Sequence, residues 1–348
     1  MQKVRLKAVR YPLVLRHPFG LATGSRTHTP CVMVRATTGD CWGIGEASLP
    51  PYHGETEDSV LRFIHSVDMN GIDLDEGIVA AMKKVDALSD ADNAAKAAID
   101  IALHDLLGKM RGMSIGEMLD VPQQPAPPSC MTIALGDMGA LPQKIGEARD
   151  FKVIKLKLGG TDDLRLLSEV KALTDKAIYA DANQAWADRG QALEMAQELQ
   201  RSGFAMLEQP MPRQASRADM EWLVARSPLP VYADEAVKRL PDLAWARHCF
   251  HGINIKLMKC TGLTEAKAMI ERCREFGLGV MLGCMTETSC ATMAMAHLAP
   301  MADHIDLDGP FLISNNPFMY PALIEGRVMP GTGPGIGLQV SENGTWPV

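Results

Sequence analysis

The 348-residue chain has no apolar run close to the roughly 20 residues that a membrane-spanning helix needs. Charged residues interrupt its N-terminus too often for the apolar region of a secretory signal. Lys and Arg number 35 against 42 Asp and Glu, so the net charge is −7 and no general basic surface exists. We therefore expect a cytoplasmic protein that binds neither nucleic acid nor a membrane.

Two further motifs are missing. The eight cysteines contain no C-x-x-C pair, which argues against a disulfide or zinc framework and favours reduced, packed thiols. No G-x-G-x-x-G follows the first strand, which argues against a dinucleotide-binding open sheet. Hydrophobic residues make up 47% of the chain and charged residues 22%, so a core can form and composition gives no case for disorder.

The first 120 residues read as an α+β unit. Alternating patterns at 3–8 and 32–44, with a turn at 38–40, predict antiparallel strands. Helical spacing predicts helices over 57–67, 76–88 and 93–109. A proline cluster then breaks regular structure and marks the best domain boundary, at Pro122, Pro125, Pro127 and Pro128.

Beyond this boundary, short apolar runs alternate with amphipathic helical stretches. The runs are 129–135, 153–158, 177–183, 205–210, 231–236, 253–259, 278–283 and 304–310. The last seven carry a residue at the expected strand end, 22 to 27 residues apart, which is the pitch of a βα unit. Eight such strands predict a closed (β/α) barrel, with an open doubly wound sheet as the alternative. We expect a module at 1–122, the barrel at 123–312 and a segment at 313–348 that returns to the module.

Three consecutive predicted strands end in acids, namely Asp181, Glu208 and Asp234. Active sites in barrels lie at the carboxyl-terminal ends of the strands, so these acids should converge. Three converging carboxylates repel each other by several kcal/mol unless a cation lies between them. Ligation by oxygen alone favours one Mg²⁺ or a similar hard ion.

Lysines end two other strands. Lys155 and Lys157 should both point into the barrel, and Lys256 on the sixth strand should face Lys157 across the pocket. Two neighbouring ammonium groups should depress one lysine pKa, which would supply a neutral general base near pH 7. Lys259 is interpreted as a loop or surface residue. A metal-bound substrate carboxylate would acidify its α-proton through an enediolate, and a base on each face predicts racemisation or epimerisation.

Two other segments suggest how a substrate is held. Asp306 and Asp308 lie two residues apart near the end of the eighth strand, and two unpaired carboxylates there would suit a substrate ammonium group. The alternative is a helix N-cap or a structural pair that closes the barrel. The glycine-containing segment 18–27 is interpreted as a mobile loop over the barrel mouth that offers Arg26 to an anionic group. The alternative is a plain surface loop with a solvated arginine.

These residues resemble the enolase superfamily, and within it the muconate-lactonizing-enzyme subgroup. The resemblance covers the whole chain, from the helical stretch 94–120 through the ordered motifs Lys155-x-Lys157, Asp181-Ala182-Asn183, Glu208-Gln209-Pro210, Asp234-Glu235 and Asn254-Ile255-Lys256. It implies an α+β capping domain built from both termini and a (β/α)7β barrel.

Within this subgroup, residues 253–259 and the Asp306/Asp308 pair resemble dipeptide epimerases. The resemblance implies that the aspartates bind a free amino group, that the metal holds the C-terminal carboxylate, and that the two lysines invert the C-terminal residue of L-Ala-D/L-Glu-type dipeptides from murein. It also implies substrate contacts at Arg26, Thr132, Lys155, Cys284 and Thr286. The residue types at 284 and 286 differ from the expected Ser and Ile, which leaves the dipeptide open.

Other activities use similar residues. An o-succinylbenzoate synthase or a cycloisomerase shares the metal and lysines, but its substrate has no ammonium for Asp306 and Asp308, and the same holds for N-acylamino acid racemisation. Acid-sugar dehydration calls for a His-Asp dyad, whereas His297 and His304 lie at neither the sixth nor the seventh strand end. A non-catalytic dipeptide-binding barrel is a further alternative, and whether the protein forms a homo-oligomer is left open.

Overall fold

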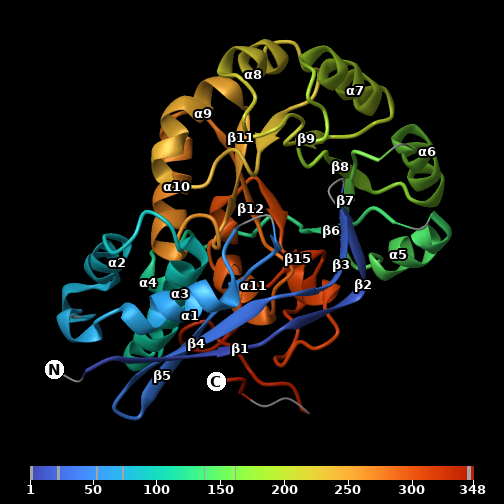
Figure 1. The fold of residues 1–348 in the computed structure, drawn as a ribbon. Helices are drawn as coiled ribbons and strands as arrows, with labels where there is room; N and C mark the ends of the chain where they lie inside the picture. Colours follow the sequence, from blue (N-terminus) through green and yellow to red (C-terminus); the bar gives the residue numbers. More distant parts are fainter. Residues whose placement is uncertain are drawn as a thin grey trace.

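The computed structural model of the protein describes residues 3–21, 24–51, 54–72, 74–136, 138–160, 162–342 and 346–348. An eight-stranded parallel sheet curls into a barrel with helices around it, and a smaller α+β unit with an antiparallel sheet lies against it (Figure 1). None of the described helices is long and apolar enough to cross a membrane.

The barrel strands pair in chain order, and a bridge between Ser129 and Ile305 joins the last strand to the first. The strands are β6 (Cys130–Ile133), β7 (Val153–Lys157), β8 (Ala177–Asp181), β9 (Met206–Glu208), β10 (Val231–Ala233), β11 (Gly252–Lys256), β12 (Gly279–Gly283) and β13 (His304–Asp306). The helices between them are α5 (Leu141–Glu147), α6 (Asp163–Leu173), α7 (Arg189–Arg201), α8 (Arg217–Val224), α9 (Leu243–Cys249), α10 (Leu263–Glu275) and α11 (Ser289–Ala296). This alternation is a (β/α)7β barrel, and the predicted fold class is confirmed.

The strand ends determine where the polar side chains lie. All predicted terminal residues end their strands except Asp234, which directly follows β10. Along β7 the inward positions change from apolar Val153 at the bottom to Lys155 and Lys157 at the top, as the two-residue period requires. The lower interior is closed by buried apolar side chains, including Tyr179 and Tyr232. Charge is therefore concentrated at the carboxyl-terminal end.

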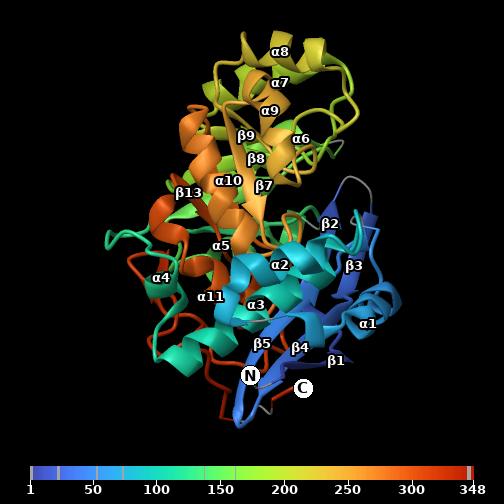
Figure 2. The same cartoon turned by 90° about the vertical axis from the view of Figure 1, so that its left-hand side faces the viewer.

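Within the described residues, the N-terminal unit contains one three-stranded sheet, one hairpin and four α-helices, besides two short 3₁₀-helices at Met69–Gly71 and Leu74–Glu76. Figure 2 shows this unit below the barrel. The sheet has the order β1 (Arg5–Arg10), β4 (Cys31–Thr38), β5 (Cys41–Ser48), and the hairpin joins β2 (Leu13–Leu21) to β3 (Gly24–Thr29). The helices are α1 (Glu57–Ser66), α2 (Ile78–Asp86), α3 (Asn93–Arg111) and α4 (Ile115–Met118). The three predicted helices agree with α1 to α3 within two residues at each end.

Helix α3 lies unusually close to β5, which explains its alanine-rich sequence. A Cβ atom at Gly43 would collide with the carbonyl oxygen of Ala102, and one at Gly45 with that of Ala98. Only glycine on the strand and small residues on the helix permit this approach.

The C-terminal segment contacts the N-terminal unit. It contains the short pair β14 (Leu323–Ile324) and β15 (Arg327–Val328), and Gly335 bridges to Ser114. The Trp346 ring meets Trp42 of β5 edge to face at 4.4 Å. Both views place the C-terminus beside the N-terminal sheet (Figures 1 and 2). The residue boundaries at 122 and 312 stay predictions.

The interpretation of 18–27 as an irregular loop is wrong for most of its length. Residues up to Leu21 continue β2, and β3 begins at Gly24, because the backbones pair from Phe19–Arg26 to Leu21–Gly24. The tip of the predicted loop, residues 22 and 23, lies outside the described residues. Closure of this segment over the barrel stays a prediction.

Candidate active site

Three carboxylates from neighbouring strands meet at the carboxyl-terminal end of the barrel. One oxygen each of Asp181, Glu208 and Asp234 lies within 4.8 Å of the others, and all three side chains are buried. Asp181 pairs directly with Glu208 in the strand register. The structure therefore brings together the acids that the strand order predicts to converge.

Lys155 and Lys157 both point into this cluster. Lys157 Nζ lies 2.6 Å from Asp181 Oδ2. Lys155 Nζ lies 3.0 Å from Asp181 Oδ2, 2.8 Å from Glu208 Oε2 and 2.8 Å from Asp306 Oδ2. Lys155 thus connects the acid cluster to the far strand β13.

The prediction that neighbouring lysines would depress one lysine pKa is wrong for Lys155. Burial disfavours its charged form, but the charges of Asp181, Asp306 and Glu208 outweigh burial and raise the pKa of Lys155 well above its usual value. The prediction counted the neighbouring ammonium and missed the three carboxylates around it. Lys155 is a fixed positive charge.

Two lysines approach Asp234 from the other side. Lys256 Nζ lies 2.7 Å from Asp234 Oδ2. Lys259, interpreted from the sequence as a loop or surface residue, does lie in the turn after β11, but it is only 2% exposed, so the surface interpretation is wrong. Its Nζ donates to Asp234 Oδ1 at 2.7 Å, to the Asp234 carbonyl at 2.6 Å and to the Asn254 carbonyl at 2.8 Å. The turn after β11 folds Lys259 back beneath Asp234.

The acids differ in how strongly they hold protons. Burial raises the pKa of Asp181, but Lys155 and Lys157 lower it to about 2. Burial likewise opposes ionisation of Asp234, yet Lys256 and Lys259 hold its pKa well below the usual range. Burial and the charge of Asp181 raise the pKa of Glu208 to about 7. The lysines therefore balance the two outer acids better than the middle one.

The donor set fits a hard divalent cation. All three groups are carboxylates, the ligands that Mg²⁺ prefers. Glu208 Oε2 is buried and accepts no hydrogen bond within the described part of the chain, although Lys155 lies nearby. Lys155 Nζ, 2.8 Å from this oxygen, supplies one positive charge, and a cation held by all three buried carboxylates would add to it.

Polar side chains that sequence reasoning gave no role support the acids. Asn254 donates to Glu208 Oε1 at 2.9 Å. Gln209 Oε1 accepts from the backbone N–H groups of Asp234 at 3.0 Å and Ala236 at 3.1 Å. Gln209 directly follows a strand-end acid and has φ of +37°, so the strained position itself marks the site. The sequence signal for Gln209 was its position in the motif Glu208-Gln209-Pro210.

The two aspartates near the end of β13 have different surroundings. Asp306 is bound to Lys155, so the expectation of two unpaired carboxylates is wrong for this residue. Asp308 makes no ion pair with any described residue; its Oδ2 accepts from the backbone N–H of Thr132 at 2.6 Å. Burial and the charge of Asp306 raise the pKa of Asp308 to about 6. Of the two aspartates, Asp308 is therefore the one that would gain most from an added cationic partner, because Asp306 is already paired with Lys155.

Two thiols flank this pair. Cys130 donates to Asp306 Oδ1 at 3.1 Å, and Cys284 donates to Asp308 Oδ1 at 3.6 Å. All eight cysteines are free, as the spacing predicts.

The remaining predicted contacts lie together between the two domains. Arg26 is on β3, stacks on Phe19 at 4.8 Å and donates to Thr286 Oγ1 at 3.4 Å. Thr286 Oγ1 also lies 2.7 Å from Thr29 Oγ1. The capping unit and the loop after β12 thus form one polar wall, although Arg26 and Thr286 are 260 residues apart.

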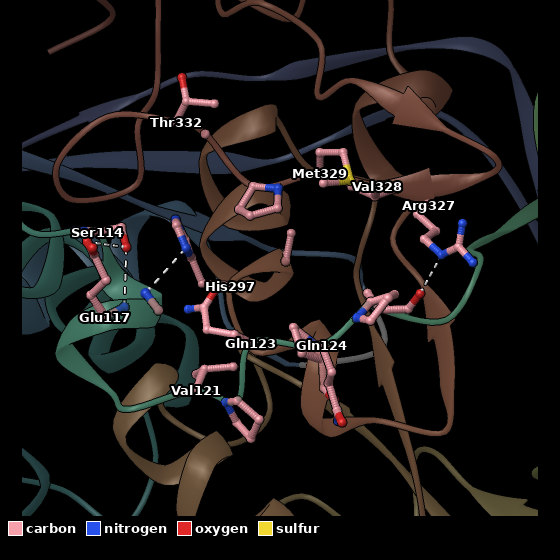
Figure 3. A pocket seen from close by; sticks show the side chains of 18 of the residues that line it. Ser114, Glu117, Val121, Gln123, Gln124, His297, Arg327, Val328, Met329 and Thr332 are labelled. Atoms are coloured by element: carbon pink, nitrogen blue, oxygen red, sulfur yellow. Dashed lines mark hydrogen bonds between the residues drawn. The ribbon is translucent and has the colours of Figure 1, made fainter.

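A large cavity of about 910 Å³ lies elsewhere, between α4, residues 121–126 and residues 324–334 (Figure 3). None of the described residues that line it is a predicted site residue. His297 reaches its wall, where Nδ1 accepts from Gly116 N at 3.3 Å and Nε2 contacts the Ile336 carbonyl at 3.2 Å. Burial lowers the pKa of His297 to about 4, so it is neutral here. These contacts give His297 a structural role.

A capped (β/α)7β barrel with three clustered acids and flanking lysines defines a class of enzyme. The chain belongs to the enolase superfamily: residues 3–120 match the mandelate racemase/muconate lactonizing enzyme N-terminal domain, and residues 137–344 match the enolase C-terminal domain-like family. It is an enzyme of the isomerase class.

Among the similar curated proteins and solved structures are several dipeptide epimerases. The chain is 42% identical over 337 residues to an L-Ala-D/L-Glu epimerase of Bacteroides thetaiotaomicron, covering 97% of this chain and 88% of the relative. It is 32% identical over 318 residues to the L-Ala-D/L-Glu epimerase of Escherichia coli, with coverage of 89% and 94%. A dipeptide epimerase from Methylococcus capsulatus, solved with Mg and L-Arg-D-Lys, superposes with a TM-score of 0.87 at 26% identity, with coverage of 97% and 99%.

Proposed function

We propose that the protein is a Mg²⁺-dependent dipeptide epimerase that inverts the C-terminal residue of L-Ala-D/L-Glu-type dipeptides, in the metabolism of murein peptides. The observation that carries this proposal is the position of Lys157 and Lys256 around the acid cluster. Their strands β7 and β11 are four apart in a ring of eight, and each lysine touches a different acid of the cluster.

Asp181, Glu208 and Asp234 would hold the cation. When bound, the ion supplies positive charge to the substrate carboxylate and makes the neighbouring C–H more acidic. Lys155 adds a fixed positive charge next to Glu208, 2.8 Å away. The buried surroundings strengthen this charge stabilisation because water screens it little.

Lys157 and Lys256 would move the proton. One lysine takes the α-proton at its Nζ from one face, and the other donates a proton from its Nζ to the opposite face. Each reaction direction needs one neutral and one protonated lysine, and the roles exchange when the substrate has the opposite configuration.

The rest of the site would fix the two ends of the dipeptide. Asp308 would bind the free ammonium, since it has the raised pKa and makes no ion pair with a described residue. Arg26 and Thr286 would face the C-terminal side chain, and an arginine there suits a glutamate carboxylate. Cys284 and Thr132 would complete the walls. An o-succinylbenzoate synthase or cycloisomerase substrate would leave Asp308 without a partner.

The activity is tested with L-Ala-L-Glu in D₂O, with NMR for deuterium at the glutamate α-carbon and for the L,D product. We expect both, and loss of both on chelation with recovery on addition of Mg²⁺. Deuterium in neither L-Ala-L-Glu nor a broad L,L-dipeptide library would contradict the proposal. Turnover of an N-succinylated amino acid in place of free dipeptides would favour another activity of the subgroup.

The roles of the lysines are tested with Lys157→Ala and Lys256→Ala, with the exposed Lys83→Ala as the matched control. Each site variant should lose epimerisation by at least about a hundredfold. One should still exchange the α-proton of only the L,L isomer and the other of only the L,D isomer. Ordinary turnover by either variant in both directions would refute the two-base assignment.

A further inference from the structure

The segment 284–288, which joins β12 to α11, is held from two sides. On the barrel side, Gly309 N donates to Cys284 Sγ at 3.2 Å. On the capping side, Ser48 donates to the Thr286 carbonyl at 2.7 Å, and Thr29 meets the Thr286 hydroxyl. Its shape therefore depends on both domains.

Glu46 on β5 accepts four hydrogen bonds, two of them from Thr288 in this segment. Its Oε1 accepts from Thr288 N at 2.8 Å and from Cys31 Sγ at 3.5 Å. Its Oε2 accepts from the Thr288 hydroxyl at 2.5 Å and from Ala291 N at 3.3 Å. The side chain is wholly buried. Four donors thus converge on one carboxylate from the capping domain.

These contacts place Glu46 at the N-terminus of the barrel helix α11. The Thr288 side chain already caps this helix locally by accepting from Cys290 N at 3.1 Å. Glu46 accepts from the next free N–H, that of Ala291. Burial raises the pKa of Glu46, and the hydrogen bonds from Thr288, Ala291 and Cys31 oppose that rise. The ionised carboxylate adds a negative charge at the positive end of the helix. An amide cannot replace it, because the NH₂ group of glutamine would face a donor at one of the two oxygens.

A second buried acid, Glu287, lies in the same segment. It accepts from Met285 N at 3.2 Å and from the Thr292 hydroxyl at 3.0 Å. Burial and the charge of Glu46 raise its pKa well above the usual value. The segment that carries Cys284 and Thr286 is thus folded around these two acids, with little freedom to adjust.

We propose that Glu46 is a positioning residue that sets the specificity for the C-terminal side chain of the substrate, by fixing the segment that carries Cys284 and Thr286. This inference rests on the proposed function. Glu46 touches no reacting atom. We expect its replacement to change the ratio of kcat/KM between dipeptides, because Lys157 and Lys256, which would transfer the protons, lie on β7 and β11 and not in this segment.

The test compares Glu46→Gln with Glu55→Gln. Glu55 is a matched control, since it also caps a helix, accepting from Ala94 N at 3.0 Å and Ala95 N at 3.4 Å at the start of α3, away from segment 284–288. Steady-state kinetics use L-Ala-L-Glu and L-Ala-L-Val. We expect Glu46→Gln to lower the ratio of kcat/KM for the glutamate dipeptide over the valine dipeptide by about tenfold, mainly through KM. Glu55→Gln should leave this ratio unchanged.

A second readout does not depend on turnover. Hydrogen exchange of the peptide covering 284–295 should accelerate in Glu46→Gln and not in Glu55→Gln. Should Glu46→Gln fail to fold, Ser48→Ala removes one contact of the same segment and should shift the ratio and the exchange in the same direction. An unchanged ratio or unchanged exchange in an active Glu46→Gln protein overturns this inference alone. Wild-type protein that epimerises no dipeptide overturns the proposed function and this inference with it.

Discussion

Replacing Lys259 by methionine tests how the site balances its charges without a metal. The change removes three hydrogen bonds, to Asp234 Oδ1 and to the carbonyls of Asp234 and Asn254. A lost buried hydrogen bond costs about 1–3 kcal/mol, although the Asp234 carbonyl still accepts from Val237 N at 3.3 Å. Asp234 keeps Lys256 at 2.7 Å, and methionine fills a similar volume without charge. We therefore expect the free energy of unfolding to fall by about 3 kcal/mol in the presence of a chelator.

Magnesium should reduce this difference. Removal of a positive charge beside Asp181, Glu208 and Asp234 makes the cluster more negative, so a divalent cation should bind the variant more tightly than the wild type. Binding to the folded state alone adds stability that grows with affinity. Urea unfolding with chelator and with saturating Mg²⁺ should show a larger gain for Lys259→Met than for the wild type.

Lys96→Met is the matched control for this experiment. Lys96 is as buried as Lys259 and donates to the Asp86 carboxylate at 2.9 Å and to two carbonyls, but it lies in the capping domain. It should lose comparable stability with the same gain from Mg²⁺ as the wild type. An equal Mg²⁺ gain in Lys259→Met and Lys96→Met would refute the charge argument, and no stability loss in Lys259→Met would refute the hydrogen-bond count.

Two further variants test the site and the domain packing. Because the folded pKa of Asp308 is raised to about 6, the folded state binds the extra proton, and wild-type stability relative to Asp308→Asn should fall by up to about 3 kcal/mol as the pH rises from about 4 to about 6. Urea unfolding against pH measures this, and a constant difference would contradict it. Gly45→Ala should lower the free energy of unfolding by about 3 kcal/mol or more, because the added Cβ would collide with the Ala98 carbonyl. Gly146→Ala in α5 is the control and should not lower it, because the space around Gly146 is open. Equal unfolding midpoints for the two variants would refute the close-packing argument.

Much of the barrel could be predicted because its repeat is local. One strand and one helix occupy 22 to 27 residues, and the strand-end residue is polar in most repeats. The repeat therefore predicts that Asp181, Glu208 and Lys256 lie at the carboxyl-terminal ends of their strands. Convergence then follows from topology alone. The capping helices were predicted for the same reason, since their apolar spacing is visible within one segment.

The errors concern partners that the sequence does not pair. The pKa of Lys155 depends on Asp306, which is 151 residues away, and Lys259 is buried because the turn after β11 folds back toward Asp234. Neither contact follows from strand alternation. The segment 18–27 was interpreted as a loop because its glycines suggested a turn, whereas pairing with its own hairpin partner extends both strands.

The contacts that join the two domains also could not be predicted, because the paired residues are far apart in the sequence. Asp100 of α3 accepts from the Thr264 hydroxyl at 2.5 Å and from Thr264 N at 3.1 Å, so it caps α10 as Glu46 caps α11. These acids lie 164 and 242 residues from the helices that they cap. Sequence rules for caps search within four residues of a helix start and cannot find them. Both capped helices follow strands of the site, β11 and β12, and both acids are buried. Sliding of the capping domain would leave buried carboxylates and helix N–H groups unpaired, so the domain interface itself fixes the shape of the site.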